Sequence, residues 1–429
     1  MKRKLIVISI DSFVNEDLEY MRQLPAFREI IEASSVVHNV TVTYPSLTHS
    51  VHTSILTGCY PERHGVIHNE QFFPFTKSMP WFEEASLCKV KTLPDFAKEA
   101  GFSTAYVYWP VTLGAQVDWN LHRGGVHTPV ENLIPTLRNR ATPGLFDEVW
   151  PYAKDTFEEP DYYVSSDAYT CRACEYMIRT YQPDVLYAHI VLIDHARHAG
   201  GVHGQHIHKA YDYLDGQLQL ILNALKDTGL DEQTILCLTS DHGHLDVERV
   251  VSINRFLLDH GLQQADQDGN LLSYDVYCHS CSLSAQIYVR QQDPELARKA
   301  RDLLWENRRL LGIGAIVDKK ECQERYHTDG DYAFMLETDG RTSFSAMPHF
   351  PLITPTDNSD YRTSKASHGH QPERGPQPAF VVRNPFAKRT VSLSHGNVID
   401  QAPTLAALLG FEMSGCDGKP IDALLRLEE

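Results

Sequence analysis

The chain has 429 residues, of which 42% are hydrophobic and 10% aromatic. This length and composition are typical of a globular protein with a large core and exclude a disordered chain. The formal net charge of −17, with no long basic run, argues against a nucleic-acid groove, which needs clustered Lys and Arg. The charge does not exclude a small anionic substrate, because bound divalent cations can reverse the local field.

The N-terminal residues 2–4 are basic, and a short apolar run, Leu5 to Ile10, follows them and ends at Asp11. This run is too short for a signal peptide or a membrane span. It is nearly continuous and rich in β-branched residues, which is typical of a strand buried on both faces of a parallel sheet. We therefore expect a cytoplasmic protein without a membrane anchor, whose first strand covers residues 4–10.

Predicted strands and helices alternate through the next part of the chain. Helices are expected at 16–22, 25–33, 92–100, 165–181 and 209–228, and strands at 35–42, 102–108, 184–193 and 233–239. Segment 112–163 is rich in Pro, Gly and Asn, and we expect an irregular excursion over the sheet edge. Alternation at this spacing predicts an α/β fold with a doubly wound, mostly parallel sheet.

The pattern changes at about residue 250. An alternating strand at 283–289, a charged helix at 293–308 and a strand at 332–338 predict an inserted α+β subdomain over 250–363. The core returns with a strand at 378–382 and a helix at 401–409. We therefore divide the chain into a catalytic core, 1–249 with 364–429, and the insertion 250–363.

Nine cysteines are scattered along the chain, and two pairs have C-x-x-C spacing, Cys171/Cys174 and Cys278/Cys281. Together they could make a four-thiolate zinc site, but a long stretch separates them and no glycines flank them as in zinc knuckles. Free thiols in helices and strands are the better prediction.

Three predicted strands end at or next to an aspartate, namely Asp11, Asp194 and Asp241. Ligands bind at the carboxyl ends of strands in such sheets, although each aspartate could also cap a following helix. His198 lies four residues after Asp194, which would place both on one side of a helical turn. His242 directly follows Asp241, and the two can converge on one ion.

Two further segments supply a hydroxyl and another imidazole, Thr48 in Pro45 to Gly58 and His368 in Ser-His-Gly-His. Carboxylate and imidazole ligands suit Zn²⁺ or Mn²⁺. The six carboxylate and imidazole residues would make two sites of three ligands, and paired ions are the arrangement for in-line displacement at phosphorus. A threonine hydroxyl is rarely ionised, and coordination to a metal is one of the few ways to activate it.

The chain resembles the alkaline phosphatase superfamily, and within it the nucleotide pyrophosphatase/phosphodiesterase family and the related phosphonoacetate hydrolases. The resemblance covers about 1–250 and 364–429, and these segments carry it: Ile8 to Asp11, Pro45 to Val66, Tyr108-Trp109-Pro110, Asp194 to His198, Thr239 to Gly243, and His368-Gly369. It implies an alkaline phosphatase-like core that binds two divalent ions, Zn²⁺ or Mn²⁺.

The resemblance also implies roles for individual residues. Asp194, His198 and His368 would hold one ion, and Asp11, Asp241 and His242 the other, with Thr48 bound to the latter. Thr48 would attack phosphorus and form a phosphothreonine intermediate, and Asn69 would donate to a phosphoryl oxygen. Thr43 is the rival nucleophile, but counting back from Gly58 places the family's nucleophile at Thr48.

Three departures from the family pattern touch the substrate side. His49-Ser50-Val51 replaces the family's Phe-Pro-Asn, Ser12 stands where glycine is usual, and the tryptophan-rich loop is reduced to Trp81-Phe82-Glu83. They weaken the nucleotide assignment and leave the metal site untouched.

We predict a two-metal hydrolase that cleaves phosphodiester or pyrophosphate bonds of small, nucleotide-like substrates. The main alternative is a phosphonate hydrolase of the phosphonoacetate type. A phosphomonoesterase is less favoured because no arginine clamp for a dianionic phosphate is evident. A sulfatase is disfavoured because no Cys-x-Pro-x-Arg segment occurs near Thr48.

A metal-stabilised binding protein without activity is the non-enzymatic alternative. The sequence does not predict the oligomeric state.

Overall fold

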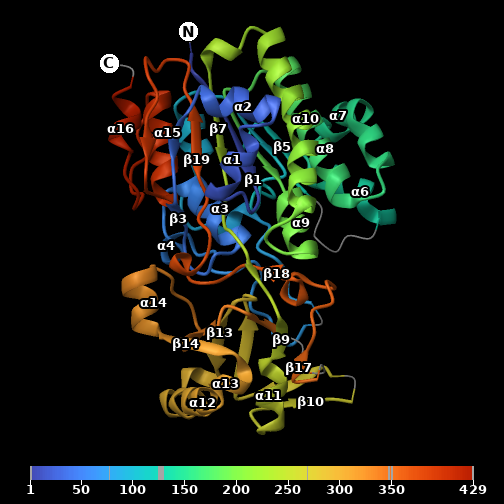
Figure 1. Ribbon diagram of the computed structural model, residues 1–429, viewed down its shortest axis with the longest axis vertical. Coiled ribbons are helices and arrows are strands. Elements are labelled where there is room, and N and C mark those ends of the chain that lie inside the picture. The colour runs from blue at the N-terminus through green and yellow to red at the C-terminus, as the bar shows by residue number, and fades with distance from the viewer. Residues whose placement is uncertain are drawn as a thin grey trace.

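An eight-stranded sheet forms the centre of the larger part of the molecule (Figure 1). The structure is a computed structural model that describes residues 2–76, 78–123, 130–267, 269–345, 348 and 351–427. The strand order is β20-β2-β19-β7-β1-β6-β4-β5. Their bounds are β1 Lys4–Ile10, β2 Ser35–Val37, β4 Thr104–Val107, β5 Trp119–Leu121, β6 Val185–Ile190, β7 Thr234–Thr239, β19 Phe380–Arg383 and β20 Ser392–Leu393.

The pairings in this sheet are parallel except those of β19, which runs antiparallel to both β7 and β2. The predicted doubly wound, mostly parallel α/β sheet is therefore confirmed.

The residues of β1 explain why helices cover both faces of the sheet. Ile6, Ile8 and Ile10 belong to one hydrophobic cluster, and Leu5 and Val7 belong to another, because successive side chains of a strand point to opposite faces. The first cluster includes helices α1 (Leu18–Met21), α2 (Pro25–Glu32), α8 (Tyr162–Thr180) and α10 (Gln205–Asp227). The second includes α3 (Thr48–Thr57), α5 (Leu93–Glu99), α15 (Gln401–Leu409) and α16 (Asp422–Leu425). Figure 1 shows α15 and α10 on opposite sides of the sheet.

Two predicted strands are shorter than expected. The strand predicted at 35–42 divides into β2 and β3 (Val40–Thr41), because Asn39 between them adopts a positive φ of 46°. The strand predicted at 184–193 ends at Ile190, and α9 (Leu192–Gly200) begins directly afterwards. Asp194 therefore lies in the first turn of a helix and not at the last position of a strand.

The prediction of an irregular excursion over 112–163 is wrong for most of its length. This segment contributes the edge strand β5, which pairs in parallel with β4, and the helices α6 (Val130–Arg140) and α7 (Leu145–Ala153). Both helices contain an internal proline. Apolar side chains such as Leu137 and Phe146 pack into the core, and this packing outweighs the helix-breaking tendency of proline. Residues 124–129 of the excursion lie outside the described residues.

The smaller part of the molecule, at the bottom of Figure 1, contains an antiparallel sheet of order β12-β13-β15-β14. Its strands are β12 Val276–Ser280, β13 Ser284–Val289, β14 Ile313–Asp318 and β15 Phe334–Thr338, and its helices are α11 Ile253–Asp259, α12 Pro294–Glu306, α13 Arg308–Leu311 and α14 Lys319–Tyr326. A second sheet combines β9 (Arg249–Ser252), β16 (Thr342–Ser345) and β17 (Ile353–Thr354). The sequence boundaries 250–363 of this part stay a prediction.

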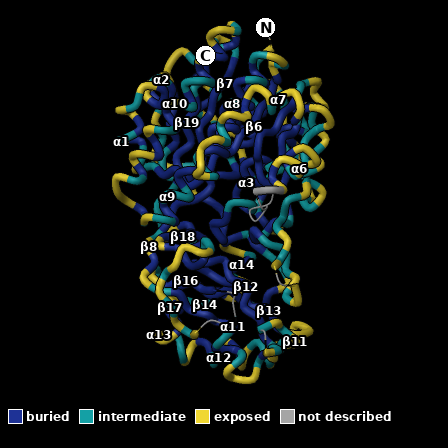
Figure 2. Tube along the Cα trace, turned by 90° about the vertical axis from the view of Figure 1, so that its right-hand side faces the viewer, coloured by how far each residue is buried: buried dark blue, intermediate teal, exposed yellow. Residues whose placement is uncertain are grey.

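Figure 2 shows buried segments through the centres of both parts, while exposed residues gather in the connections and on outer helix faces. All nine cysteines are free, as predicted. No group of possible metal ligands among the described residues includes a cysteine. Within the described ranges, no helix combines the length and the hydrophobicity that a membrane crossing requires.

Candidate active site

Three aspartates lie at the carboxyl ends of three adjacent strands. Asp11 follows β1, Asp241 follows β7, and Asp194 lies in the helix that follows β6, and the sheet order places β1 between β7 and β6. The hydrogen bonding between β1 and β6 continues to Asp11, whose backbone N–H donates to the carbonyl of Ile190 at 2.9 Å. Parallel pairing therefore brings together carboxylates that are far apart in the sequence, as their positions at strand ends predicted.

Thr48 is the first residue of α3 and lies beside this cluster. Its Oγ1 is 3.2 Å from Nε2 of His242. The same nitrogen lies 3.1 Å from Oδ2 of Asp241 and 3.5 Å from Oδ1 of Asp11. Thr48 lines the cavity described below, whereas Thr43 does not. The structure thus places Thr48 among the predicted ligands of the second ion.

The orientation of Asn69 follows from one hydrogen bond. Its Oδ1 accepts from the backbone N–H of His49 at 2.9 Å, and His49 is the residue after Thr48. Because a backbone N–H can only donate, this bond assigns the oxygen of the amide and leaves the NH₂ group free to donate. Asn69 lines the same cavity as Thr48.

Four residues form the first group of possible metal ligands, Asp194, His198, His244 and His368, whose ligand atoms all lie within 4.8 Å of one another. Nε2 of His198 and Nε2 of His244 each lie 3.3 Å from Oδ1 of Asp194. Three of these residues were predicted from the sequence, and His244 was not. The second imidazole of Asp-His-Gly-His was the available signal.

A second group contains Asp11, Asp194 and His242 within the same limit. Asp194 is common to both groups, so its carboxylate could contact an ion in either of them, whereas the sequence assigned it to one ion only. Asp241, which the sequence analysis assigned to this second ion, contacts His242 as described above.

The electrostatics of the two groups fit bound cations. Burial and the charge of Asp241 raise the pKa of Asp11 well above its usual value, and burial and the charge of Asp194 raise the pKa of Asp241 to about 7. Burial and the neighbouring His368 lower the pKa of His242, so its ring is not a compensating cation. Oδ1 of Asp11 and Oδ2 of Asp241 are buried without a hydrogen-bond partner in the described structure. A divalent cation would neutralise this charge and coordinate these oxygens, so the residues fit the expected ions.

His189 orients one of these carboxylates and was not predicted. His189 lies on β6, the strand next to β1, and its Nε2 is 3.0 Å from Oδ2 of Asp11. A histidine inside an otherwise apolar strand was the sequence signal for this contact. The bond leaves Oδ1 of Asp11 directed toward His242.

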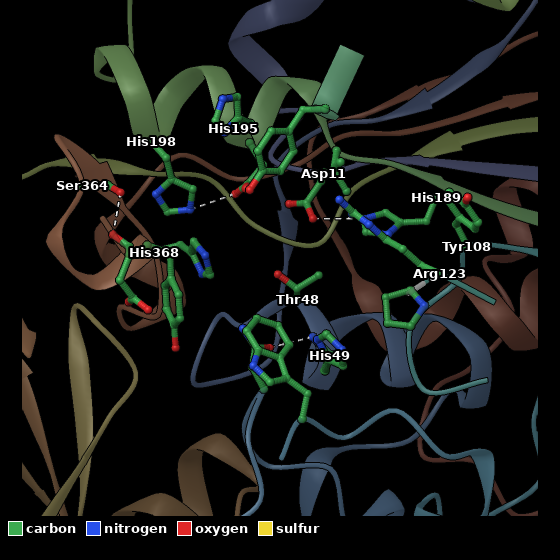
Figure 3. A pocket seen from close by; sticks show the side chains of 18 of the residues that line it. Asp11, Thr48, His49, Tyr108, Arg123, His189, His195, His198, Ser364 and His368 are labelled. Atoms are coloured by element: carbon green, nitrogen blue, oxygen red, sulfur yellow. Dashed lines mark hydrogen bonds and ion pairs between the residues drawn. The ribbon is translucent and has the colours of Figure 1, made fainter. Parts of the chain in front are cut away.

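A cavity of about 320 Å³ opens onto the cluster. In Figure 3, His198 and His368 lie on one side of Thr48 and Arg123 lies on the other. The segments 112–163 and 250–363 both contribute to its lining, with Arg123 from the former and Tyr361 from the latter. Further aromatic side chains in the lining include Trp81, Tyr108 and Tyr163.

Arg123 brings a positive charge to this cavity. Its guanidinium lies over the rings of Tyr162 and Tyr163, at 5.4 and 5.9 Å from their centroids. Arg140, by contrast, is paired with Glu83 of the lining at 2.9 Å. No arginine clamp was predicted from the sequence, because Arg123 follows β5, a strand that was not predicted either.

The fold and the carboxylate–imidazole cluster together define a member of the alkaline phosphatase-like class. The profile of the family described as type I phosphodiesterase / nucleotide pyrophosphatase matches residues 5–371. The chain belongs to this family.

Sequence relatives are distant. Human ectonucleotide pyrophosphatase/phosphodiesterase family member 1 is 24% identical over 266 residues, which are 59% of this chain and 25% of that protein. An uncharacterized pyrophosphatase/phosphodiesterase of Schizosaccharomyces pombe is 25% identical over 251 residues, 56% of this chain and 44% of that protein. The match therefore spans about a quarter of the human relative.

A solved structure matches nearly the whole chain. An inactive variant of murine ectonucleotide pyrophosphatase/phosphodiesterase 5, in complex with AMP, superposes with a TM-score of 0.69 at 17% identity. The match covers 99% of this chain and 100% of that chain. At this identity the similarity establishes the fold.

Proposed function

We propose that this protein is a two-metal hydrolase that cleaves phosphodiester or pyrophosphate bonds of small, nucleotide-like substrates. The observation that carries the proposal is the position of Thr48 Oγ1, 3.2 Å from His242 in a cluster of buried carboxylates. Asp194, His198 and His368 would hold one ion, and Asp11, Asp241, His242 and Thr48 the other. The donor set suits Zn²⁺, with Mn²⁺ as the alternative.

The chain's own residues would perform the displacement. When bound, the ions would act as Lewis acids and favour ionisation of the Thr48 hydroxyl. Thr48 Oγ1 would form a bond to phosphorus, the bond from phosphorus to the leaving oxygen would break, and the leaving group would take up a proton. The NH₂ of Asn69 would donate to a phosphoryl oxygen as charge develops on it. Water would then hydrolyse the phosphothreonine and restore the hydroxyl.

The cavity lining supports a nucleotide-like substrate. Trp81, Tyr163 and Tyr361 offer aromatic surface on which a base can stack. The structural relative that was solved with AMP, an inactive variant with a threonine replaced by alanine, agrees with this substrate class and with a threonine nucleophile.

Arg123 supports a second candidate, hydrolysis of a phosphonate or a phosphomonoester. A guanidinium can bind a carboxylate or phosphate through two parallel hydrogen bonds. Placed in the cavity, Arg123 would bind a second anionic group such as the carboxylate of phosphonoacetate.

A substrate panel tests the proposal. The panel contains bis-p-nitrophenyl phosphate, a nucleoside triphosphate, p-nitrophenyl phosphate, phosphonoacetate and p-nitrophenyl sulfate, assayed with Zn²⁺ and with Mn²⁺. We expect the diester and the triphosphate to have the highest kcat/KM. If phosphonoacetate or the monoester were the best substrate, the result would favour the second candidate function. If the sulfate ester were the best substrate, it would overturn the proposed substrate class. The predicted cytoplasmic location is part of the proposal, and fractionation of native cells would test it.

A further inference from the structure

Three imidazoles lie around Asp194, those of His198, His244 and His368. In each of them Nδ1, the ring nitrogen that faces away from Asp194, contacts another polar group of the protein. Nδ1 of His198 lies 2.7 Å from the carbonyl oxygen of Ala366, and Nδ1 of His368 lies 3.1 Å from that of Ser46. A carbonyl can only accept, so the proton of each ring is on Nδ1 and the lone pair on Nε2 faces inward. Fixing the tautomer through the distant ring nitrogen is the usual way in which proteins prepare a histidine to bind a metal.

His244 repeats this arrangement with a side chain in place of a carbonyl. Its Nδ1 lies 2.7 Å from Oγ of Ser12, and its Nε2 lies 3.3 Å from Nε2 of His198. With the proton on Nδ1 donated to Ser12, the Nε2 of His244 becomes a third inward-facing lone pair beside the carboxylate of Asp194. Lone pairs at this separation repel one another unless a cation lies between them.

The backbone of Ser12 provides an independent observation. Ser12 adopts a positive φ of 65°, a conformation that disfavours any residue except glycine. Ser12 adopts this unfavourable backbone conformation, and its buried hydroxyl contacts His244. Through this contact Ser12 acts on the group of possible metal ligands and not on the substrate side of the site.

We propose that His244 is a fourth protein ligand of the ion held by Asp194, His198 and His368, and that Ser12 is the positioning residue that orients it. The inference rests on the two-ion site proposed above. Four protein ligands complete the tetrahedral shell of zinc, as in structural sites. The fourth ligand of the second ion is the hydroxyl of Thr48, which is a weaker donor than an imidazole while it keeps its proton. We therefore expect the first ion to bind more tightly and the two sites to fill in order.

Zinc titration of the metal-free protein tests the inference without an activity assay. The full chain is stripped with a chelator and titrated with Zn²⁺ in competition with a chromophoric chelator, for the wild type, His244→Ala and Ser12→Gly. We expect two classes of site in the wild type. His244→Ala should weaken the tighter class by well over tenfold, and Ser12→Gly should weaken it by roughly tenfold, the lower range for a residue that orients a ligand.

X-ray absorption at one equivalent of Zn²⁺ gives a direct count of ligands. The wild type should show three imidazoles and His244→Ala two. Two imidazoles in both proteins, or unchanged zinc affinity in His244→Ala, would overturn the inference. A wild type that binds no zinc would instead overturn the two-ion proposal, so the two failures are distinguishable.

His64 supplies a matched control. It is also fully buried, and its Nε2 lies 2.9 Å from Oγ of Ser54, so it too forms a histidine–serine pair. His64→Ala should leave both zinc affinities unchanged, whatever its effect on stability. Ser12→Gly relieves an unfavourable φ and should fold normally, so the test does not depend on His244→Ala being stable.

Discussion

The side-chain oxygen of Thr48 lies 3.2 Å from Nε2 of His242, the ring nitrogen that also faces the carboxylates of Asp11 and Asp241. A hydroxyl in this position shares its surroundings with three possible metal ligands. Replacing Thr48 by Ala should therefore lower kcat roughly 10³-fold or more, because the nucleophile is lost. Circular dichroism and zinc content should stay close to those of the wild type.

Thr43→Ala is the control for this prediction. Its hydroxyl is buried and lies outside the cavity lining. We expect activity close to the wild type. Full activity in Thr48→Ala together with loss of activity in Thr43→Ala would identify Thr43 as the nucleophile.

His368→Ala should remove one ion. The substitution takes a ligand from the first group, and the remaining ion should stay in the second. After dialysis against a weak chelator, elemental analysis should find one zinc per chain in the variant and two in the wild type. His370→Ala is a close control, because this neighbouring buried imidazole has its Nδ1 against the carbonyl of Gln371 and belongs to none of the described ligand groups. Two retained ions in His368→Ala would exclude His368 as a ligand.

Chelation should destabilise the folded protein. Removing the cations leaves Asp11 and Asp241 buried beside each other without compensating charge. Ligand binding to the native state adds about 4 kcal/mol at a concentration a thousand times Kd. Differential scanning calorimetry should show a lower Tm after chelation and its recovery on addition of Zn²⁺. An unchanged Tm in a protein shown to be free of metal would contradict the prediction.

Glu337 should make stability depend on pH. Burial raises the pKa of its carboxyl to about 8, although Tyr44 Oη and the backbone N–H of Gln371 donate to it at 3.0 Å. The folded state therefore holds a proton that the unfolded state releases near its ordinary pKa of 4.5. This stabilisation is complete below about pH 4.5 and is lost as the pH rises through 8.

Glu337→Gln removes this titration and preserves the shape of the side chain. Urea unfolding between pH 5 and 9 should show the wild type losing stability relative to the variant across this range. Parallel pH profiles for the two proteins would show that Glu337 does not titrate in the folded state.

Arg123→Gln should distinguish substrates by charge. If Arg123 binds a terminal anionic group, its loss should lower kcat/KM about 10- to 100-fold for substrates that carry one, since hydrogen bonds to charged groups contribute about 1.5–3 kcal/mol. Bis-p-nitrophenyl phosphate lacks such a group and should be cleaved as before. The control Arg138→Gln removes a surface arginine that pairs with Asp147. Equal loss for all substrates in Arg123→Gln would point to a structural role.

The parts of the site that follow from local pattern could be predicted from the sequence. Asp11 and Asp241 come directly after apolar runs, and parallel pairing brings the ends of such runs together. His198 follows Asp194 by one helical turn. The sheet and most helices were predicted for the same reason, because their hydrophobic periodicity is strong.

The parts that depend on contacts distant in the sequence could not be predicted. The sequence shows His244 as the second imidazole of Asp-His-Gly-His, but its position beside Asp194 and His198 follows only from the fold. The position of Arg123 depends on the edge strand β5, which has only three residues and is too short for an alternating pattern to be recognised. The helices α6 and α7 contain prolines, and only their packing against the core reveals them.

The order of the ligands along the chain has a consequence for biosynthesis. Asp11 to His244 are translated before the smaller part of the molecule, and His368 only after it. His368 is then fixed against the nucleophile segment, because its Nδ1 and the N–H of Gly369 both bond to the carbonyl of Ser46. With the proposed ligands, a growing chain would carry an incomplete metal site until the whole insertion has been synthesised, so a fully loaded first site would mark a molecule whose synthesis has passed residue 368.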